Sequence, residues 1–270
     1  MTEHNHYAPP RTEVRDIPVG DPLDSEHFNP EGRTCPAGSG WRWFGVAWRL
    51  FKAQPLAWWG VLLLSFVLLV VVSMIPLLNL LTSVIFPVAM AGLGSCAHSL
   101  MRDGRFEITQ VFDGFKRRPG ALLMAGLLYL LIMMLSMGVV FLFSAASVTA
   151  MFLGSVAERQ MAMQQVFSAG GLMVLGYFAA MALAMSTIVF SPYLIHERNV
   201  PVPQALLMSF KASFKNVPAS IVWILSYLLW AVVATIPLGL GWLVLLPVVV
   251  ITGYVGYRDI FYGSDQGRGF

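Results

Sequence analysis

Charged side chains are scarce in this sequence, and the few that occur are confined to short segments. Asp, Glu, Lys and Arg make up 11% of the 270 residues, whereas about a quarter of the residues in a soluble globular protein are charged. Four stretches carry no charge at all: 53–101, 119–157, 160–196 and 216–257. Each is longer than the roughly 20 residues that a helix needs to cross a bilayer core of about 30 Å. The scarcity of charge therefore excludes an ordinary soluble domain and indicates a polytopic membrane protein.

Cysteine is also scarce, with Cys35 and Cys96 as the only two in the sequence. Cys35 belongs to a polar N-terminal segment and Cys96 to an apolar stretch, so a structural disulfide between them is not expected. The first 40 residues contain seven acidic residues and six prolines but no basic start followed by an apolar core, so they do not form a secretory signal. This composition predicts a disordered cytoplasmic tail over residues 1–40, a membrane domain over 41–263 and a short tail over 264–270.

Proline and glycine divide the apolar stretches into six predicted spans. Ile75-Pro76-Leu77 interrupts the first stretch and Ile236-Pro237-Leu238 interrupts the last, because proline cannot continue the hydrogen-bonding pattern of a helix. The segment 144–169 is expected to extend two helices beyond the bilayer as a hairpin. The predicted spans lie near residues 56–76, 80–100, 121–143, 170–194, 218–236 and 240–257. The fold class is therefore all-α, a polytopic bundle of transmembrane helices.

The basic residues near the spans lie almost entirely on one side of the bundle. Thirteen Lys and Arg residues fall before span 1, between spans 2 and 3, between spans 4 and 5, and after span 6, whereas only Arg159 falls on the other side. Cytoplasmic loops carry such an excess, so we predict that both termini are cytoplasmic. The net charge of +3 is too small and too scattered to indicate a nucleic acid partner, and the expected partners are membrane lipids.

The pattern Phe-Lys-x-x-Pro occurs three times, beginning at Phe51, Phe115 and Phe214, and each copy stands just before an odd-numbered span. Self-similarity in a fixed order marks a repeated structural unit, so we expect three helix pairs, each preceded by a short cytoplasmic helix. These short segments are amphipathic, which is typical of helices that lie in the interface with a basic face toward lipid phosphates. The alternative is that they only anchor the rim of the bundle. The candidate anionic-lipid contacts are Arg42, Arg49, Lys52, Lys116, Arg117, Arg118, Lys211 and Lys215.

No Asp, Glu, Lys or Arg lies inside a predicted span, which argues against an ion-coupled pump. The reactive side chains nearest to a span interior are Ser95, Cys96 and His98. A serine and a histidine can form a nucleophile and its base, but no acidic residue stands near enough in the sequence to orient the histidine. A Cys-x-His pair without two further ligands is a weak metal signal. Because close packing through Ala91, Ser95 and Ser99 explains the same positions, we predict no catalytic residue, no metal and no cofactor.

Three segments of the sequence carry a family resemblance: Trp48-Arg49-Leu50-Phe51, Gln54-Pro55-Leu56-Ala57-Trp58 and Gly256-Tyr257-Arg258-Asp259-Ile260-Phe261. They resemble a group of uncharacterised proteobacterial inner-membrane proteins, and the resemblance runs from about Trp41 to Gly263. The repeated span pairs are also similar, more remotely, to the membrane domains attached to some bacterial glycerophosphodiester phosphodiesterases. The resemblance implies a six-helix fold and a bacterial inner-membrane location, and it implies no activity or binding residues.

These observations leave several hypotheses for the function. The first is a non-enzymatic membrane protein that organises lipid or a partner protein. The alternative is a transporter or channel for an uncharged or lipidic solute, with a path between the repeats near Pro76 and Pro237, where the helices break. A third hypothesis, an intramembrane enzyme, requires the side chains of Ser95 and His98 to lie together.

Overall fold

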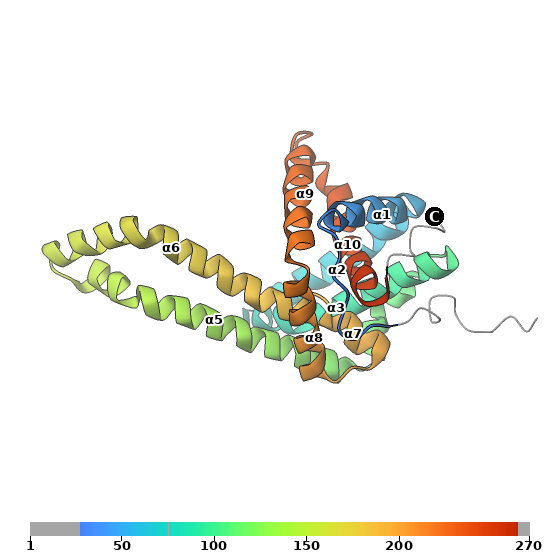
Figure 1. Ribbon diagram of the computed structural model, residues 1–270, viewed down its shortest axis with the longest axis horizontal. Helices are drawn as coiled ribbons and strands as arrows, with labels where there is room; N and C mark the ends of the chain where they lie inside the picture. The colour runs from blue at the N-terminus through green and yellow to red at the C-terminus, as the bar shows by residue number, and fades with distance from the viewer. Residues whose placement is uncertain (1–27, 75, 264–270) are drawn as a thin grey trace, which may run out of the picture.

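The computed structural model describes residues 28–74 and 76–263, and all the regular elements in these ranges are helices (Figure 1). The first half of this part of the chain contains α1 (Ser39–Ala53), α2 (Pro55–Ser73), α3 (Pro76–Asp103), the 3-10 helix η1 (Ile108–Phe112), α4 (Asp113–Lys116) and α5 (Pro119–Leu153). The second half contains α6 (Val156–Ile188), α7 (Ser191–Arg198), α8 (Val202–Lys215), α9 (Val217–Thr235) and α10 (Trp242–Tyr262).

The predicted all-α fold is confirmed for the described residues. Among them, five helical segments are long and apolar enough to cross a membrane: Thr82–Asp103, Pro119–Val139, Val174–Arg198, Val217–Thr235 and Trp242–Tyr262. A sixth is obtained when α1 and the beginning of α2, which are bent by 98° at their junction, are taken together. The six predicted spans fall on α2, α3, α5, α6 with α7, α9 and α10, and the candidate that contains α2 also includes α1.

Each copy of Phe-Lys-x-x-Pro lies where a short helix ends and a long helix begins. Pro55 and Pro119 are the first residues of α2 and α5, and Pro218 is the second residue of α9. Proline suits the first turn because the N–H that it lacks has no helical partner there. The long helices pair as α2–α3, α5–α6 and α9–α10, so the predicted arrangement of three helix pairs, each after a short helix, is present.

Each short helix packs mainly against the pair that precedes its own. Helix α1 contacts α9 and α10, η1 and α4 contact α3, and α8 contacts α6 and α5. Glycine permits two of these close approaches, because a Cβ on Gly40 would lie 2.3 Å from the carbonyl oxygen of Ala219 and one on Gly114 would lie 2.1 Å from that of Val88. The three repeats thus form a closed ring, in which the first short helix completes the contact with the third pair.

The hairpin of α5 and α6 extends away from the rest of the molecule (Figure 1). The two helices contain 35 and 33 residues, and a capping box between Ser155 and Glu158 begins α6. Measured from the end of the span predicted near residue 143, the remaining residues to Leu153 reach about 15 Å further at 1.5 Å per residue. The hairpin expected over residues 144–169 is therefore present as the continuation of two helices.

The segment before α1 corrects one prediction. The backbone N–H groups of Asn29 and Arg33 donate to the carbonyl oxygens of Phe261 and Ile260, both at 2.8 Å. These carbonyls belong to the last turn of α10, where a helix leaves acceptors without intrahelical partners. The disordered tail predicted over residues 1–40 is therefore wrong for residues 28–40, because this polar segment supplies the donors that the helix end needs. Residues 1–27 and 264–270 lie outside the described residues.

An ion-pair cluster fixes the same segment to α10. The carboxylate of Asp259 accepts hydrogen bonds from Arg33, from Arg42 at 2.8 Å and from the indole N–H of Trp43 at 2.8 Å. Asp259 is only 4% exposed, so these donors replace the water that burial removes from its carboxylate. Burial, together with the charge of Asp259, raises the pKa of the nearby Cys35 thiol to about 11. The cluster therefore joins the N-terminal segment, the first helix and the last helix.

Candidate anion-binding site

A polar cavity of about 370 Å³ opens where the C-terminal ends of α3, α7 and α10 meet. Each of the three helix pairs contributes one of these ends, because α7 follows directly on α6. We call it the arginine cavity, since its walls include four guanidinium groups and two carboxylates, from Arg102, Arg117, Arg198, Arg258, Asp113 and Glu197. The convergence of three helix ends thus places four arginines around one space.

Two of the arginines are held against a single aromatic ring. The guanidinium carbons of Arg258 and Arg198 lie 4.0 and 5.0 Å from the ring centroid of Tyr262. Arg198 also donates through Nε to the hydroxyl of Tyr262 at 2.6 Å. A cation near an aromatic face is attracted by the ring, and this attraction grows when the cation is desolvated, as Arg258 is at 2% exposure. Tyr262 therefore positions two positive charges at the wall of the cavity.

Glu197 accepts a hydrogen bond inside the arginine cavity. The hydroxyl of Tyr254 lies 2.9 Å from Oε1 of Glu197 and 2.6 Å from Nδ1 of His98. A carboxylate can only accept, so Tyr254 donates to Glu197 and its oxygen accepts from the Nδ1–H of His98. This chain connects α10, α7 and α3 and sets the tautomer of the histidine.

Ser95 and His98, the hypothesised nucleophile and base, take part in different hydrogen bonds. The hydroxyl of Ser95 lies 3.0 Å from Nε2 of His196, whereas the ring of His98 contacts Tyr254. Ser95 also lies 3.2 Å from the carbonyl oxygen of Ala91 within its own helix. The structure thus brings Ser95 to a histidine 101 residues away, at the rim of the same polar cavity, and does not join it to the neighbour expected from the sequence.

Three of the eight predicted lipid contacts support the fold. Each donates to a group on another part of the chain and so ties two segments together. Arg42 donates to Asp259 at 2.8 Å, Arg118 to the carbonyl of Asn199 at 2.8 Å and Lys215 to the carbonyl of Gly32 at 2.7 Å. Their charges therefore have structural partners in addition to any lipid.

The other five predicted contacts divide between the cavity and the surface. Arg117 lines the arginine cavity, and Lys116 lies beside it with its Nζ 3.2 Å from the carboxylate of Asp113. The remaining three are exposed on the short helices: Arg49, Lys52 and Lys211. Of the predicted set, only Arg117 belongs to the arginine cavity itself.

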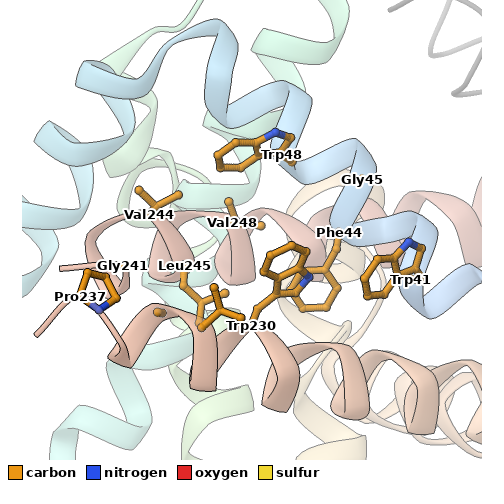
Figure 2. A pocket seen from close by; sticks show the side chains of 12 residues that line it. Trp41, Phe44, Gly45, Trp48, Trp230, Pro237, Gly241, Val244, Leu245 and Val248 are labelled. Atoms are coloured by element: carbon orange, nitrogen blue, oxygen red, sulfur yellow. The ribbon is translucent and has the colours of Figure 1, made fainter. Parts of the chain in front are cut away.

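A second hollow, of about 390 Å³, lies between α1, α9 and α10 and is almost entirely apolar (Figure 2). We call it the tryptophan groove, after Trp41, Trp48 and Trp230 in its walls. The rings of Trp41 and Trp230 are stacked with their centroids 6.0 Å apart. Pro237 and Gly241 lie at its end near the turn between α9 and α10. The groove therefore reaches the helix break that the sequence marks in the third pair.

The sequence did not single out most residues of the arginine cavity, although it contains a signal for them. An arginine followed by Asp or Asn occurs in or next to the last turns of the candidate spans Thr82–Asp103, Val174–Arg198 and Trp242–Tyr262: Arg102-Asp103, Arg198-Asn199 and Arg258-Asp259. These dipeptides recur at the same place in each unit, as Phe-Lys-x-x-Pro does. Equivalent positions in a ring of three repeats face a common centre, so the recurrence would have predicted a shared arginine site.

The described residues thus form an all-α protein with helices long enough to span a membrane and with an arginine-lined cavity at one set of helix ends. Comparisons of the chain with protein-family models, with curated proteins and with solved structures find no match. The functional interpretation accordingly depends on the geometry and the charges of the chain itself.

Proposed function

We propose that the chain is a non-enzymatic, multi-pass protein of a bacterial inner membrane that holds an anionic lipid by its phosphate in the arginine cavity. The observation that carries this proposal is the set of four arginines around a space of about 370 Å³ at the ends of candidate spans. Guanidinium groups bind phosphate oxygens with two parallel hydrogen bonds, and a cavity of a few hundred Å³ is the size of a small-molecule site.

The charge balance of the arginine cavity favours an anion. Arg102 is bound by Asp103, and Asp113 is bound by Lys116, so these charges have partners nearby. Over the whole lining of the cavity, four guanidinium groups face two carboxylates, an excess of two positive charges. The three helix C-termini oppose an anion with about half a negative charge each, which reduces this excess without reversing it.

The depth of the cavity suits a lipid headgroup. The ends of α3, α7 and α10 are on the side of the thirteen basic residues, which the positive-inside rule assigns to the cytoplasm. A cavity at the end of a span lies at headgroup level, where anionic phospholipids present their phosphates. The proposal therefore includes cytoplasmic termini and the inner-membrane location that the family resemblance implies.

The binding proposal can be tested by native mass spectrometry of the protein released from nanodiscs that contain equal parts of phosphatidylglycerol and phosphatidylcholine. The wild type is expected to retain phosphatidylglycerol preferentially. Replacing Arg117 and Arg198 with glutamine should abolish the preference, whereas the matched replacement of Arg49 and Lys211, which removes the same charge from the exposed rim, should preserve it. Equal loss in both variants would indicate diffuse attraction and overturn the proposal.

A second experiment distinguishes a lipid ligand from free phosphate, because both present phosphate oxygens to the arginines. Inorganic phosphate is added to the released protein at millimolar concentration before the spectra are recorded. Retention of phosphatidylglycerol in its presence supports a lipid ligand, because the acyl chains hold the headgroup in place. Displacement of the lipid by phosphate would show that the site takes the soluble anion and would refute the lipid form of the proposal.

The alternative function is a transporter or channel for an uncharged or lipidic solute. The tryptophan groove favours it, because this apolar hollow reaches Pro237 at a helix break, and broken helices line the substrate sites of many transporters (Figure 2). A flux assay in liposomes that contain the purified protein distinguishes transport from lipid binding. Specific flux of a neutral solute, reduced by Gly45→Trp in the groove, where a side chain meets open space, would favour transport over lipid binding.

A further inference from the structure

Glu197 places a negative charge in the wall of a cavity that attracts anions. It belongs to α7, its side chain is 17% exposed, and it lines the arginine cavity together with the four arginines. Like charges repel, so Glu197 weakens the attraction of the arginines for any phosphate group that enters the cavity. A site that recognised only the phosphate would therefore bind its ligand more tightly without this carboxylate.

A structural role accounts for one of the two oxygens of Glu197. Oε1 accepts the hydrogen bond from the hydroxyl of Tyr254 at 2.9 Å and lies 3.9 Å from Nδ1 of His98. Among the described residues, Glu197 makes no further hydrogen bond or ion pair. Oε2 is also not one of the buried polar atoms that lack a partner, so it has accessible surface. A carboxylate oxygen accepts about two hydrogen bonds, and Oε2 is therefore an open acceptor at the wall of the cavity.

An open acceptor beside the arginines favours a headgroup that has hydrogen-bond donors next to its phosphate. Hydroxyl groups donate without carrying a charge, whereas an ammonium group is repelled by the excess of positive charge in the lining. A carboxylate in the headgroup would be repelled by Glu197. A glycerol headgroup carries its hydroxyls within three carbons of the phosphate, so both parts can occupy the same cavity of about 370 Å³.

We infer that Glu197 selects the lipid by accepting a hydrogen bond from hydroxyl groups of the headgroup, so that the arginine cavity takes a polyol phospholipid such as phosphatidylglycerol. This inference rests on the proposed function and names the class of lipid that the site binds. The arginines hold the phosphate, which all phospholipids share, and Glu197 distinguishes the group attached to it. A hydrogen bond to a charged acceptor favours binding by about tenfold, and one to a neutral acceptor by about twofold.

The test compares two lipids that differ only in the hydroxyl groups of the headgroup. Phosphatidylpropanol has the charge and the three-carbon headgroup of phosphatidylglycerol but neither hydroxyl. Both are added in equal amounts to phosphatidylcholine nanodiscs, and native mass spectrometry of the released protein measures their ratio. The wild type should retain phosphatidylglycerol about tenfold over phosphatidylpropanol. Glu197→Gln, which keeps an acceptor for Tyr254, should lower this preference to about twofold.

Asp113→Asn is the matched control, because it removes the same charge from the lining of the same cavity. The carboxylate of Asp113 already has Lys116 as its partner, at 3.2 Å. Its replacement should leave the ratio of the two lipids within twofold of the wild type. Since the two lipids carry equal charge, a purely electrostatic role of Glu197 would change their total retention and not their ratio.

Four results would contradict the inference. Equal retention of phosphatidylglycerol and phosphatidylpropanol by the wild type, with both preferred over phosphatidylcholine, would overturn the selection by Glu197 and leave the phosphate site intact. An equal fall of the ratio in Glu197→Gln and Asp113→Asn would show a general effect of charge and would also overturn it. Preferential retention of phosphatidylethanolamine, added in the same amount, would show recognition of an ammonium group instead. Retention of neither anionic lipid over phosphatidylcholine would remove the proposed function, and the inference with it.

Discussion

Asp259 is the single side chain whose removal should most disturb the junction between the N-terminal segment, α1 and α10. Its buried side chain accepts hydrogen bonds from Arg33, Arg42 and Trp43. Asp259→Ala leaves two guanidinium groups and an indole N–H without this acceptor. Removing one partner of a buried ion pair typically costs about 3–5 kcal/mol.

The cost here should be lower, because the partners can recover part of their hydration. The side chains of Arg33 and Arg42 are 31% and 49% exposed, so water replaces some of the lost hydrogen bonds. The indole of Trp43 is buried and adds a penalty of about 1 kcal/mol for its unpaired N–H. We therefore expect Asp259→Ala to lower the free energy of unfolding by about 2–4 kcal/mol, and Asp259→Asn by about half as much.

The assay is thermal unfolding of the purified protein in detergent at a fixed scan rate. For a chain of this size the loss corresponds to a fall in Tm of roughly 5–12 °C. Asp103→Asn, which removes an exposed carboxylate from the end of α3, serves as the control and should leave Tm unchanged. A second measurement combines Asp259→Ala with Arg33→Ala, whose effects should be less than additive. A Tm for Asp259→Ala within 1 °C of wild type would refute the stabilising role of Asp259 at this junction. Full additivity of the two substitutions would refute the interaction between Asp259 and Arg33.

Three further predictions concern packing, reactivity and orientation. Gly92→Val should destabilise the fold by about 1–3 kcal/mol in the same thermal assay, because a Cβ there would lie 1.9 Å from a carbonyl oxygen of η1, whereas Gly60→Ala, in open space, should be tolerated. In a background without the second cysteine, Cys35 should react slowly with iodoacetamide at pH 8 in the folded protein and fast after denaturation. Its raised pKa keeps the folded thiol protonated, so folded-state stability should fall as pH rises from about 9 to 11. In a cysteine-free background, an impermeant maleimide added to intact cells should label Arg159→Cys but not Arg105→Cys; the reverse pattern would contradict cytoplasmic termini.

The spans could be predicted because a bilayer imposes a length and an absence of charge that a single sequence displays. The repeat at Phe51, Phe115 and Phe214 further predicted three units, since it records where a short helix ends and a long one begins. The repeat does not predict which helices each short helix packs against. That α1 packs on α9 and α10, through the missing side chain of Gly40, depends on contacts between residues nearly 180 positions apart.

The candidate site was harder to predict for the same physical reason. The local spacing suggested Ser95 with His98, because both lie on one helix, but side-chain direction and the tertiary contacts decide which groups meet. In the structure Ser95 meets His196, and His98 meets Tyr254. The composition of residues 28–40 also led to a wrong prediction, because it is typical of a solvated tail. In the structure, backbone N–H groups of this segment and the side chain of Arg33 donate hydrogen bonds to carbonyl oxygens near the end of α10.

The central claim is that the arginine cavity holds the phosphate of an anionic lipid, and a structure of the protein in nanodiscs rich in phosphatidylglycerol tests it most directly. The account predicts a headgroup phosphate in the cavity, within hydrogen-bonding distance of guanidinium groups from Arg117, Arg198 and Arg258. Ordered phosphatidylglycerol elsewhere on the protein surface, with only water in the arginine cavity, would contradict it.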